Sequence, residues 1–278
     1  MQKKRKINKT KPNWLKTKIP GGKNYIAVKN IVKKNNLHTV CQEAFCPNLP
    51  ECWSNGTATF MILGDTCTRN CRFCDVKTGA PKIPDDNEPK RVANAVKLMK
   101  LKFVVLTSPT RDDIPDGGAD FWAMTIKTIK KVNPNCKIEL LIPDFKGDLE
   151  SLQTVLDAKP DILGHNLETA ESLYENVRPE ANYQQSLTLL QNAKKLGAIT
   201  KTGIMVGLGE TEDEIIQIMR DAHRVGVRYF TLGQYLQPTK ENTVVEEFVT
   251  PEKFEYYRKI GMEIGFQHVE SGPLVRSS

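Results

Sequence analysis

Two groups of closely spaced cysteines offer the clearest chemistry in this chain of 278 residues. The first group, Cys67, Cys71 and Cys74, has the spacing C-x3-C-x2-C and directly follows an apolar run. A structural zinc ion takes four protein ligands, and an electron-transfer cluster is usually held by four cysteines. Three thiolates on one loop therefore predict an iron–sulfur cluster with one iron left open to bind a substrate. The alternative is a zinc site or a four-ligand cluster that a distant residue completes.

The second group precedes the first in the chain and is also a triad. Cys41, Cys46 and Cys52 have the spacing C-x4-C-x5-C, so a fourth ligand must come from elsewhere. One interpretation is a zinc site completed by His38 or Cys136. Cys136 begins an expected strand, however, where a cysteine is usually a small buried hydrophobic residue. The spacing alone leaves a zinc site and a cluster both open.

The elements that position the first triad are expected to form one large α/β domain. Short apolar runs alternate with helical patterns, and they predict strands over residues 58–63, 103–107, 137–142, 161–166, 202–206 and 229–232. Two helices have clear starts, a capping box at 211–214 and Thr250 before Pro251. Six strand–helix units with right-handed crossovers predict a partial (β/α)6 TIM-like barrel. Its active face should lie at the carboxyl ends of the strands.

The positive charge of the chain is concentrated at its N-terminus. The formal net charge is +7, but residues 1–34 hold 12 of the 40 lysines and arginines and no acidic residue. The remaining residues carry 28 basic against 33 acidic side chains. A mildly acidic body argues against a nucleic-acid-binding function. The basic arm is either a solvated tail, which we favour, or an electrostatic guide toward an acidic partner.

Cysteine usage and hydropathy indicate the compartment. Six of the seven cysteines lie between Cys41 and Cys74, and no apolar region of a secretory signal is present. Metal ligation in a reducing compartment is therefore expected rather than disulfide bonding. No stretch reaches about 18 apolar residues, so a membrane-spanning helix is not expected. We expect a cytoplasmic protein with no membrane partner.

Beyond the triads, the chain resembles the lipoyl synthases of the radical S-adenosylmethionine (SAM) superfamily. The resemblance runs from about Val40 to the C-terminus and includes both triads in the family's order and spacing. It also includes the segments Val105-Leu-Thr-Ser, Arg111-Asp-Asp-Ile-Pro-Asp-Gly-Gly, Gly164-His-Asn-Leu-Glu-Thr, Val177-Arg-Pro, Thr202-Gly-Ile-Met-Val-Gly-Leu-Gly-Glu, Gly233-Gln-Tyr-Leu-Gln-Pro and Arg276-Ser-Ser.

The resemblance implies a role for each triad. The triad at 67–74 would hold the 4Fe-4S cluster that cleaves SAM to a 5′-deoxyadenosyl radical, and the triad at 41–52 would hold an auxiliary 4Fe-4S cluster. The fourth ligand of the auxiliary cluster would be a serine of the terminal motif, and the family pattern favours Ser278. Because the sequence stops at Ser278, whereas the family motif continues, Ser277 and the terminal carboxylate remain alternatives. Serine oxygen is a harder iron ligand than thiolate, which suits a cluster that gives up its sulfur.

The resemblance also implies the reaction, the partners and the domain organisation. Sulfur would be inserted at C6 and C8 of an octanoyl-lysine, with two SAM molecules used per product. The substrate would be an octanoylated lipoyl carrier domain or a glycine-cleavage H protein, and the enzyme would also need a reducing electron donor and an iron–sulfur carrier that rebuilds the auxiliary cluster. Residues 1–57 would form the basic arm and a cluster-binding extension, 58–270 the barrel, and 271–278 a segment that returns to the auxiliary cluster.

Several residues are expected to contact the radical cluster or SAM. Aromatic Phe73 is expected to cover the cluster, and polar or small residues near strand ends are expected to contact SAM; they are Thr107, Asp116, Gly117, Gly118, Asn166, Glu168 and Arg178. Glycines let the backbone approach a ligand, and an arginine fork matches a carboxylate. The alternatives are an ordinary turn for the glycine pair, a helix cap for Asn166 and Glu168, and a solvated side chain for Arg178.

Two other functional classes share part of this pattern. Another sulfur-inserting radical enzyme, similar to biotin synthase or a methylthiotransferase, would have the same first triad. An iron–sulfur electron carrier or a zinc-binding scaffold would be the non-enzymatic alternative. An auxiliary triad placed before the barrel argues against the first class, and two triads rather than two quartets argue against the second.

Overall fold

The computed structural model describes residues 11–16, 21–44 and 46–277. Its helices are α1 (Lys23–Lys34), α2 (Val40–Glu43), α3 (Leu49–Ser54), α4 (Glu88–Leu98), α5 (Ala119–Val132), α6 (Leu149–Asp157), α7 (Tyr174–Val177), α8 (Tyr183–Lys195), α9 (Glu212–Arg224) and α10 (Pro251–Ile264), with short 3-10 turns at Asn13–Leu15, Phe145–Gly147 and Glu171–Leu173. Its strands are β1 (His38–Thr39), β2 (Thr59–Met61), β3 (Thr66–Cys67), β4 (Lys77–Thr78), β5 (Phe103–Thr107), β6 (Lys137–Leu141), β7 (Ile162–Gly164), β8 (Thr200–Val206), β9 (Tyr229–Gln234) and β10 (His268–Gly272).

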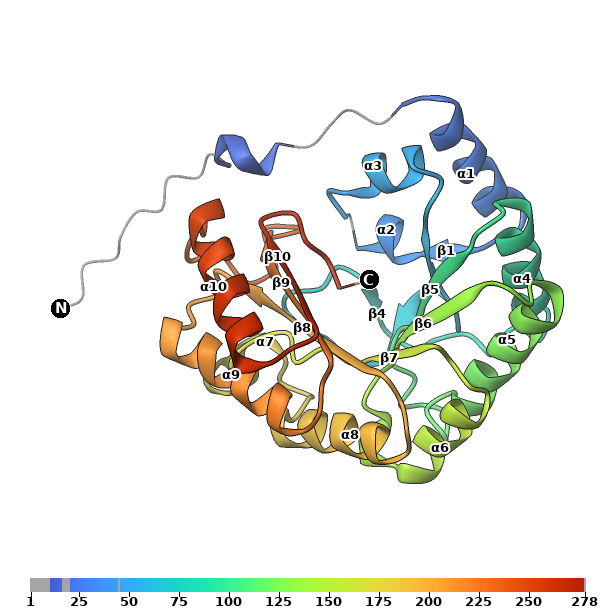
Figure 1. Ribbon diagram of the computed structural model, residues 1–278. Helices are drawn as coiled ribbons and strands as arrows, with labels where there is room; N and C mark the ends of the chain where they lie inside the picture. Colours follow the sequence, from blue (N-terminus) through green and yellow to red (C-terminus); the bar gives the residue numbers. More distant parts are fainter. Residues whose placement is uncertain (1–10, 17–20, 45, 278) are drawn as a thin grey trace.

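One curved sheet forms the centre of the fold. Its strand order is β1-β2-β5-β6-β7-β8-β9-β10, and every neighbouring pair from β2 to β10 is parallel. Helices lie in an arc on the outside of the strands, and the C-terminal segment enters the inside (Figure 1). Within the described residues the sheet has two edges, β1 and β10, so it is an open barrel. The predicted partial barrel is confirmed.

All six predicted strands are present, and β10 adds a seventh parallel strand. It pairs with β9 from His268↔Tyr229 to Gly272↔Gly233. The strand has only one apolar residue, Val269, which is 1% exposed. Its other positions are polar or glycine, so the apolar pattern that marks the other strands is missing here. The barrel therefore continues through Gly272, and the tail begins after it.

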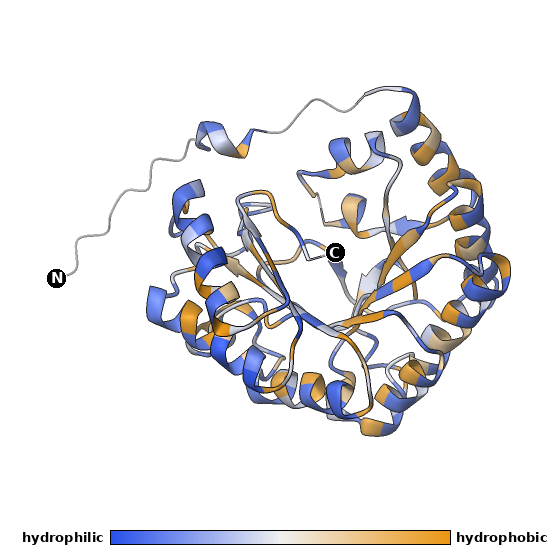
Figure 2. Ribbon diagram, in the orientation of Figure 1, coloured by the Kyte–Doolittle hydropathy of each residue, from blue (hydrophilic) through white to orange (hydrophobic). Residues whose placement is uncertain are grey.

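The helices pack an apolar face onto the sheet. Figure 2 shows orange residues on the strands and on the helix sides that face them, with blue residues outside. The capping box predicted for α9 is present, because the Thr211 side chain accepts from the backbone of Glu214 while the Glu214 side chain accepts from the backbone of Thr211. Helix α10 begins after the N-cap Thr250, as expected, and ends at Gly265, whose φ is 116°.

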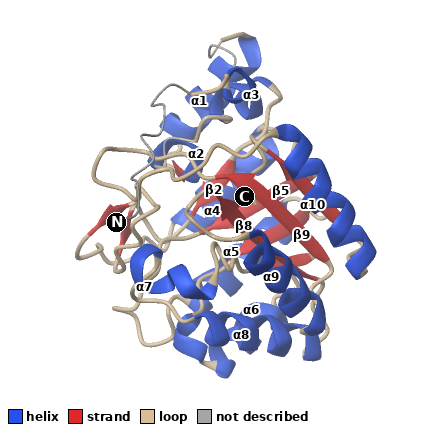
Figure 3. Ribbon diagram, turned by 90° about the vertical axis from the view of Figure 1, so that its left-hand side faces the viewer, coloured by secondary structure: helices blue, strands red, loops and turns tan. Residues whose placement is uncertain are grey.

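The extension before the barrel shares the hydrophobic core of the first barrel strands. Trp53 of α3 is 1% exposed, and its ring lies 5.4 Å from that of Tyr25 on α1. Figure 3 shows α1, α2 and α3 together at one end of the molecule. Strand β1 joins the extension to the barrel through antiparallel pairing with β2. This arrangement fixes the segment of the second triad relative to the strands.

None of the described helices has the length and apolarity of a membrane span.

Candidate active site

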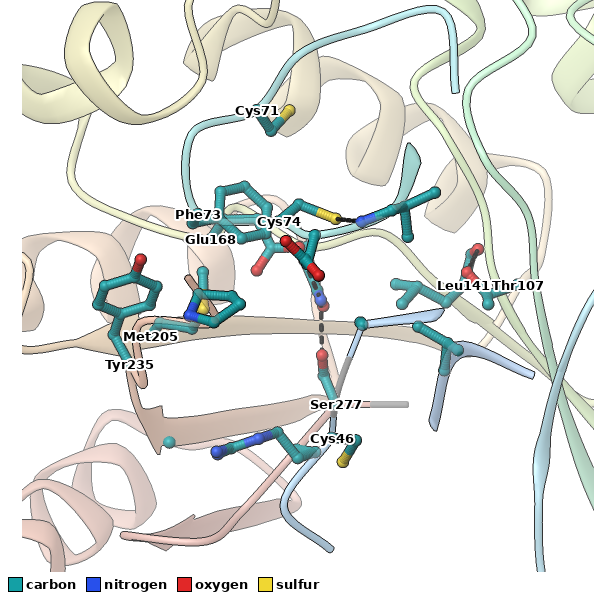
Figure 4. A pocket seen from close by; sticks show the side chains of 18 of the residues that line it. Cys46, Cys71, Phe73, Cys74, Thr107, Leu141, Glu168, Met205, Tyr235 and Ser277 are labelled. Carbon is teal, nitrogen blue, oxygen red and sulfur yellow. Dashed lines mark hydrogen bonds between the residues drawn. The ribbon is translucent and has the colours of Figure 1, made fainter. Parts of the chain in front are cut away.

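Side chains from both cysteine triads line one cavity of about 400 Å³ at the carboxyl ends of the strands. The lining cysteines are Cys41, Cys46, Cys67, Cys71 and Cys74. Figure 4 shows Cys71 and Cys74 on one side of the cavity, and Ser277 and Cys46 on the other. Cys52 lies behind this surface, packed against the hydrophobic core. Two triads that are separate in the sequence thus face a common space.

The radical-cluster loop, residues 64–74, leaves β2 through a left-handed residue. Leu63 has φ 68°, which is unfavourable for a branched side chain, and Gly64 follows with φ 90°. The backbone N–H of Leu63 donates to the buried Glu88 carboxylate at 2.7 Å, and the Leu63 carbonyl accepts from Arg111 at 3.0 Å. Both hydrogen-bonding groups of the strained residue are therefore held by side chains, which fixes where the loop begins.

Inside the loop, Arg69 is held by two carboxylates. Its guanidinium donates to Asp144 at 2.7 and 2.8 Å and to Asp112 at 2.7 and 3.1 Å. Arg69 is 7% exposed, and Asp144 is 1% exposed. Burial alone would raise the pKa of Asp144, but the hydrogen bonds and charge of Arg69 lower it to about 2. The ion pair ties the loop to the segments that follow β5 and β6.

A second anchor comes from the loop between β9 and α10. The side-chain amide of Asn242 donates to the Cys74 carbonyl at 2.9 Å, and the backbone N–H of Thr243 donates to the Arg72 carbonyl at 2.9 Å. The Tyr235 hydroxyl donates to the Thr243 carbonyl at 2.6 Å, which fixes this loop to the end of β9. Neither Arg69 nor Asn242 was among the predicted site residues.

The C-terminal tail, residues 273–277, connects the auxiliary triad to the inside of the barrel. The Asn48 amide donates to the Leu274 carbonyl at 2.5 Å. The Arg276 guanidinium lies beside Cys46; burial lowers the pKa of Arg276, and the nearby Cys46 acts in the opposite direction. Arg276 and Ser277 both line the cavity. The predicted ligand, Ser278, follows Ser277 directly and lies outside the described residues.

Two glycines make room for the tail. A Cβ at Gly233 on β9 would lie 2.2 Å from the Val275 carbonyl oxygen. A Cβ at Gly203 on β8 would lie 3.0 Å from the Ser277 Cβ and 2.2 Å from the Thr231 hydroxyl. Any larger residue at either position would therefore push against the tail or its neighbour. The absence of a side chain at these positions lets the tail lie directly on the strands.

The ends of β7 and the following turn bring the predicted polar residues together. Asn166 is 7% exposed and donates to Glu168 at 3.1 Å and to Ser277 at 2.5 Å. Burial raises the pKa of Glu168, while the Arg178 charge and the Asn166 hydrogen bond lower it in part. Arg178 is 8% exposed, and its Nη1 donates to the carbonyls of Asn166 and Leu167 and contacts the Tyr174 hydroxyl. The solvated alternative for Arg178 is wrong.

Comparison with known proteins identifies the family. The Radical SAM superfamily model matches residues 61–222, and the model of the N-terminal domain of lipoyl synthase matches residues 1–46. The chain is 53% identical to the lipoyl synthase of Rubrobacter xylanophilus over 96% of this chain and 84% of that protein. It is 52% identical to that of Parabacteroides distasonis, over 96% and 95%, and 51% identical to a mitochondrial lipoyl synthase of Nematostella vectensis, over 96% and 92%. The chain belongs to the lipoyl synthase family.

Solved structures support the fold of this lipoyl synthase family member. Methylornithine synthase aligns with a TM-score of 0.58 at 15% identity, covering 76% of this chain and 69% of that chain. The hydrogenase maturase HydG of Carboxydothermus hydrogenoformans aligns with a TM-score of 0.58 at 16% identity, covering 76% and 57%. At this identity the likeness shows the fold alone. As a radical SAM lipoyl synthase, the chain is an enzyme that uses SAM and 4Fe-4S clusters.

The thiols of this lipoyl synthase family member fit cluster ligands. Burial raises the pKa of the Cys74 thiol to about 12 and that of Cys41 to about 11. Such thiols stay neutral until iron stabilises the thiolates. No three His, Cys, Asp or Glu side chains among the described residues converge enough to hold a single metal ion. The cysteine thiolates of an iron–sulfur cluster bind different iron atoms, so their sulfur atoms do not have to converge on a single position.

Unpartnered polar atoms near the cavity fit a bound polar cofactor. The Nε of Arg178 and the hydroxyl of Ser108 are buried without a hydrogen-bond partner among the described residues, and both residues line the cavity. A buried donor without a partner costs about 1–3 kcal/mol, which a ligand oxygen can offset. Phe73 and Thr107 also line the cavity. Thr107 uses its hydroxyl to donate to the Leu141 carbonyl at 3.1 Å.

The segment 116–118 lies at the start of α5, and its contact with SAM stays a prediction. Its residues are not among the described side chains that line the cavity. Asp116 instead accepts from the backbone N–H of Gly118 and of Asp120, which caps the start of α5. A Cβ at Gly118 would lie 2.6 Å from Leu63, and one at Gly117 would lie 2.8 Å from Phe145. The geometry favours packing around the strained Leu63 over direct contact with SAM.

Proposed function

We propose that this lipoyl synthase inserts sulfur at C6 and C8 of a protein-bound octanoyl group lying in the cavity between its two cysteine triads. One observation supports this most directly, namely that cysteines of both triads line the same cavity, all except Cys52. Apolar side chains lie between the cysteines, and they include Met61, Leu141, Ile204 and Met205. An alkyl chain has no polar group to bind, so orientation must come from such apolar walls. The same walls exclude water from a reactive intermediate.

The cofactors supply the chemistry, and the residues supply positions for it. When bound, SAM and its cluster supply the radical that removes hydrogen from an unactivated carbon, and the auxiliary cluster supplies sulfur. Cys67, Cys71 and Cys74 hold the first cluster on a loop that Arg69 and Asn242 fix in place. Because three cysteines would leave one iron of the cluster without a protein ligand, that iron would be open to the methionine end of SAM.

Arg178 and Glu168 bind the polar parts of SAM in this proposal. The free Nε of Arg178 suits the methionine carboxylate, since an arginine donates strongly to anionic oxygen. Glu168 accepts hydrogen bonds from the amino group or the ribose. Arg178 is buried and Glu168 is partly buried at the cavity, so their hydrogen bonds form in a lower-dielectric surrounding than water and are stronger there.

The auxiliary cluster is held by Cys41, Cys46 and Cys52, with Ser278 as the fourth ligand. The supporting contacts are those of the tail, because Arg276 lies beside Cys46. The Ser277 hydroxyl already accepts a hydrogen bond from Asn166 at 2.5 Å. That contact leaves the next residue as the better candidate for iron.

The organisation of the chain supports a division of roles. Residues 1–57 carry the auxiliary triad, and the barrel runs from residue 58 through Gly272, two residues further than the expected boundary at 270. The segment after Gly272 returns to the triad. All seven cysteines are free thiols, which supports a reducing compartment such as the cytoplasm. The substrate is an octanoylated lipoyl carrier domain or H protein, and a reductant and an iron–sulfur carrier complete the cycle.

Anaerobic reconstitution tests the proposal. Loaded enzyme is incubated with reductant, SAM and an octanoyl-lysine peptide, and 5′-deoxyadenosine and dithiolane product are measured. Cys46→Ala should keep SAM cleavage and lose the dithiolane product, whereas Cys71→Ala should lose both. Cys136→Ala is the matched control, because Cys136 is buried outside this cavity and should retain both products. Absence of both products from fully loaded wild type would contradict the assignment.

A further inference from the structure

The hydrogen bond between Asn166 and Ser277 joins two parts of the site. The Nδ2 of Asn166 donates to the Ser277 hydroxyl at 2.5 Å and to the Glu168 carboxylate at 3.1 Å. An amide nitrogen has two hydrogens, and here each has one acceptor. Asn166 is 7% exposed, so water offers little competition for either contact. Figure 4 shows the Ser277 contact as a dashed line below Glu168.

The space around this contact is shaped for it. A Cβ at Gly203 would lie 3.3 Å from Asn166 Oδ1 and 3.0 Å from the Ser277 Cβ. The backbone at Gly203 also accepts from the N–H of Glu168 at 3.0 Å, which holds the left-handed turn of Glu168 at φ 67°. Gly203 of β8 therefore lies against Asn166, Ser277 and Glu168. Asn166, Ser277 and Glu168 have fixed relative positions as long as the tail is in place.

We propose that Asn166 is a positioning residue that couples SAM binding to the seating of the C-terminal tail. This inference rests on the proposed function, in which Glu168 contacts SAM. With the tail seated, Ser277 holds one amide hydrogen and the other is aimed at Glu168. Glu168 is then oriented for SAM before SAM arrives, which removes an ordering cost. When the tail leaves, Asn166 loses a partner and Glu168 loses its fixed orientation.

Coupling of this kind acts in both directions. If the seated tail strengthens SAM binding, SAM must stabilise the seated tail by the same factor. The tail carries the proposed ligand of the auxiliary cluster, so SAM binding would also favour a complete auxiliary cluster. The enzyme would thus make its radical mainly when the sulfur source is in place. A radical formed beside an incomplete sulfur source would have no partner to trap the substrate carbon.

The test compares SAM affinity and tail protection in three proteins. Oxidised, cluster-loaded wild type, Ser277→Ala and Ser271→Ala are studied anaerobically without reductant, so that SAM is bound but not cleaved. Ser271 is the matched control, because its hydroxyl donates to the Phe254 carbonyl and does not contact Asn166. Equilibrium dialysis gives the affinity, and mass spectrometry follows amide hydrogen exchange in the tail peptide. Iron content shows that each protein carries both clusters.

We expect Ser277→Ala to bind SAM about 5-fold more weakly or worse, at the lower end of typical coupling between sites. SAM should slow tail exchange in the wild type and in Ser271→Ala but not in Ser277→Ala. Equal affinity in the wild type and Ser277→Ala, or tail exchange unaffected by SAM in the wild type, would overturn the inference. Failure of the wild type to bind SAM would instead contradict the proposed function itself.

A double-mutant cycle locates the coupling in the Asn166–Ser277 bond. Asn166→Ala alone is expected to weaken SAM binding, and adding Ser277→Ala to it should cause no further loss. Non-additivity of this kind is the signature of residues that act through one contact. An equal loss from Ser277→Ala in both backgrounds would show that Asn166 does not carry the effect.

Discussion

The side chain of Asn242 donates to the carbonyl oxygen of Cys74 at 2.9 Å and so joins two residues 168 positions apart. The adjacent backbone contact from Thr243 to Arg72 makes this a two-point attachment. The loop after β9 therefore holds the far end of the radical-cluster loop, while Glu88 and Arg111 hold its beginning. The positions of Cys67, Cys71 and Cys74 thus depend on contacts made far along the chain.

Asn242→Ala should loosen the radical cluster without abolishing the fold. Removing the amide leaves the Cys74 carbonyl without its donor, and the expected loss in free energy of unfolding is about 1 kcal/mol. Iron release to a chelator should be faster than in the wild type. Asn24→Ala removes another amide-to-carbonyl hydrogen bond, to Ser54 in the extension, and should leave iron release unchanged. Equal release rates in Asn242→Ala and wild type would exclude this anchor.

Arg69→Met should be much more destabilising than loss of a surface arginine. It leaves Asp112 and Asp144 close together without their cation, and removal of one partner of a buried ion pair costs about 3–5 kcal/mol. Urea unfolding of the protein without clusters measures this directly. Arg258→Ala, which removes an exposed pair with Glu255, serves as the control and should show no clear change. Similar unfolding midpoints for the two variants would refute the role of Arg69.

The same ion pair predicts a pH dependence. The pKa of Asp144 lies at about 2, below its ordinary 3.8. A carboxyl group whose pKa is lowered by folding stabilises the folded state above its unfolded pKa, and this contribution disappears as the pH falls through the folded value. Stability from Asp144, about 2 kcal/mol, should therefore be lost between about pH 5 and pH 2. Asp144→Asn should flatten that part of the stability curve, and an unchanged slope would count against the assignment.

Gly233→Ala should affect the auxiliary cluster more than the radical cluster. The new methyl group would lie 2.2 Å from the Val275 carbonyl oxygen, so the tail must move away from β9. Iron content should fall toward that of the radical cluster alone, while SAM cleavage to 5′-deoxyadenosine continues at saturating SAM, where weaker SAM binding does not limit it. Gly21→Ala is the control, because nothing lies within 4 Å of its added methyl group. Full iron content in Gly233→Ala would show that the auxiliary cluster does not require the tail to pack on Gly233.

The strands and the two triads were predictable because their signals are local. Apolar runs such as 103–107 and 229–232 mark strands, and the cysteine spacings lie within 12 residues. β10 was missed because only Val269 turns its apolar side chain into the core. The burial of Arg178 beside Asn166 was not predicted, since Arg178 before Pro179 carries no apolar pattern of its own. Only the family resemblance indicated a role for this residue.

Other features of the site depend on contacts between distant segments. Arg69 looks like an ordinary loop residue until Asp112 and Asp144 are brought to it by two separate strands. Gly203 and Gly233 look like strand interruptions until the tail is placed over them. No local sequence pattern predicts these contacts, because the partners are far apart in the sequence and come together only in the folded barrel.

The position of Ser277 inside the barrel has a practical consequence for handling the protein. Any residues attached beyond it must start beside the cavity. A purification tag fused there would start beside the cavity and next to the tail residues that Asn48 and Asn166 hold. Affinity tags and fluorescent reporters therefore belong at the other end of the chain, and a C-terminal fusion should be read as a perturbation of the enzyme.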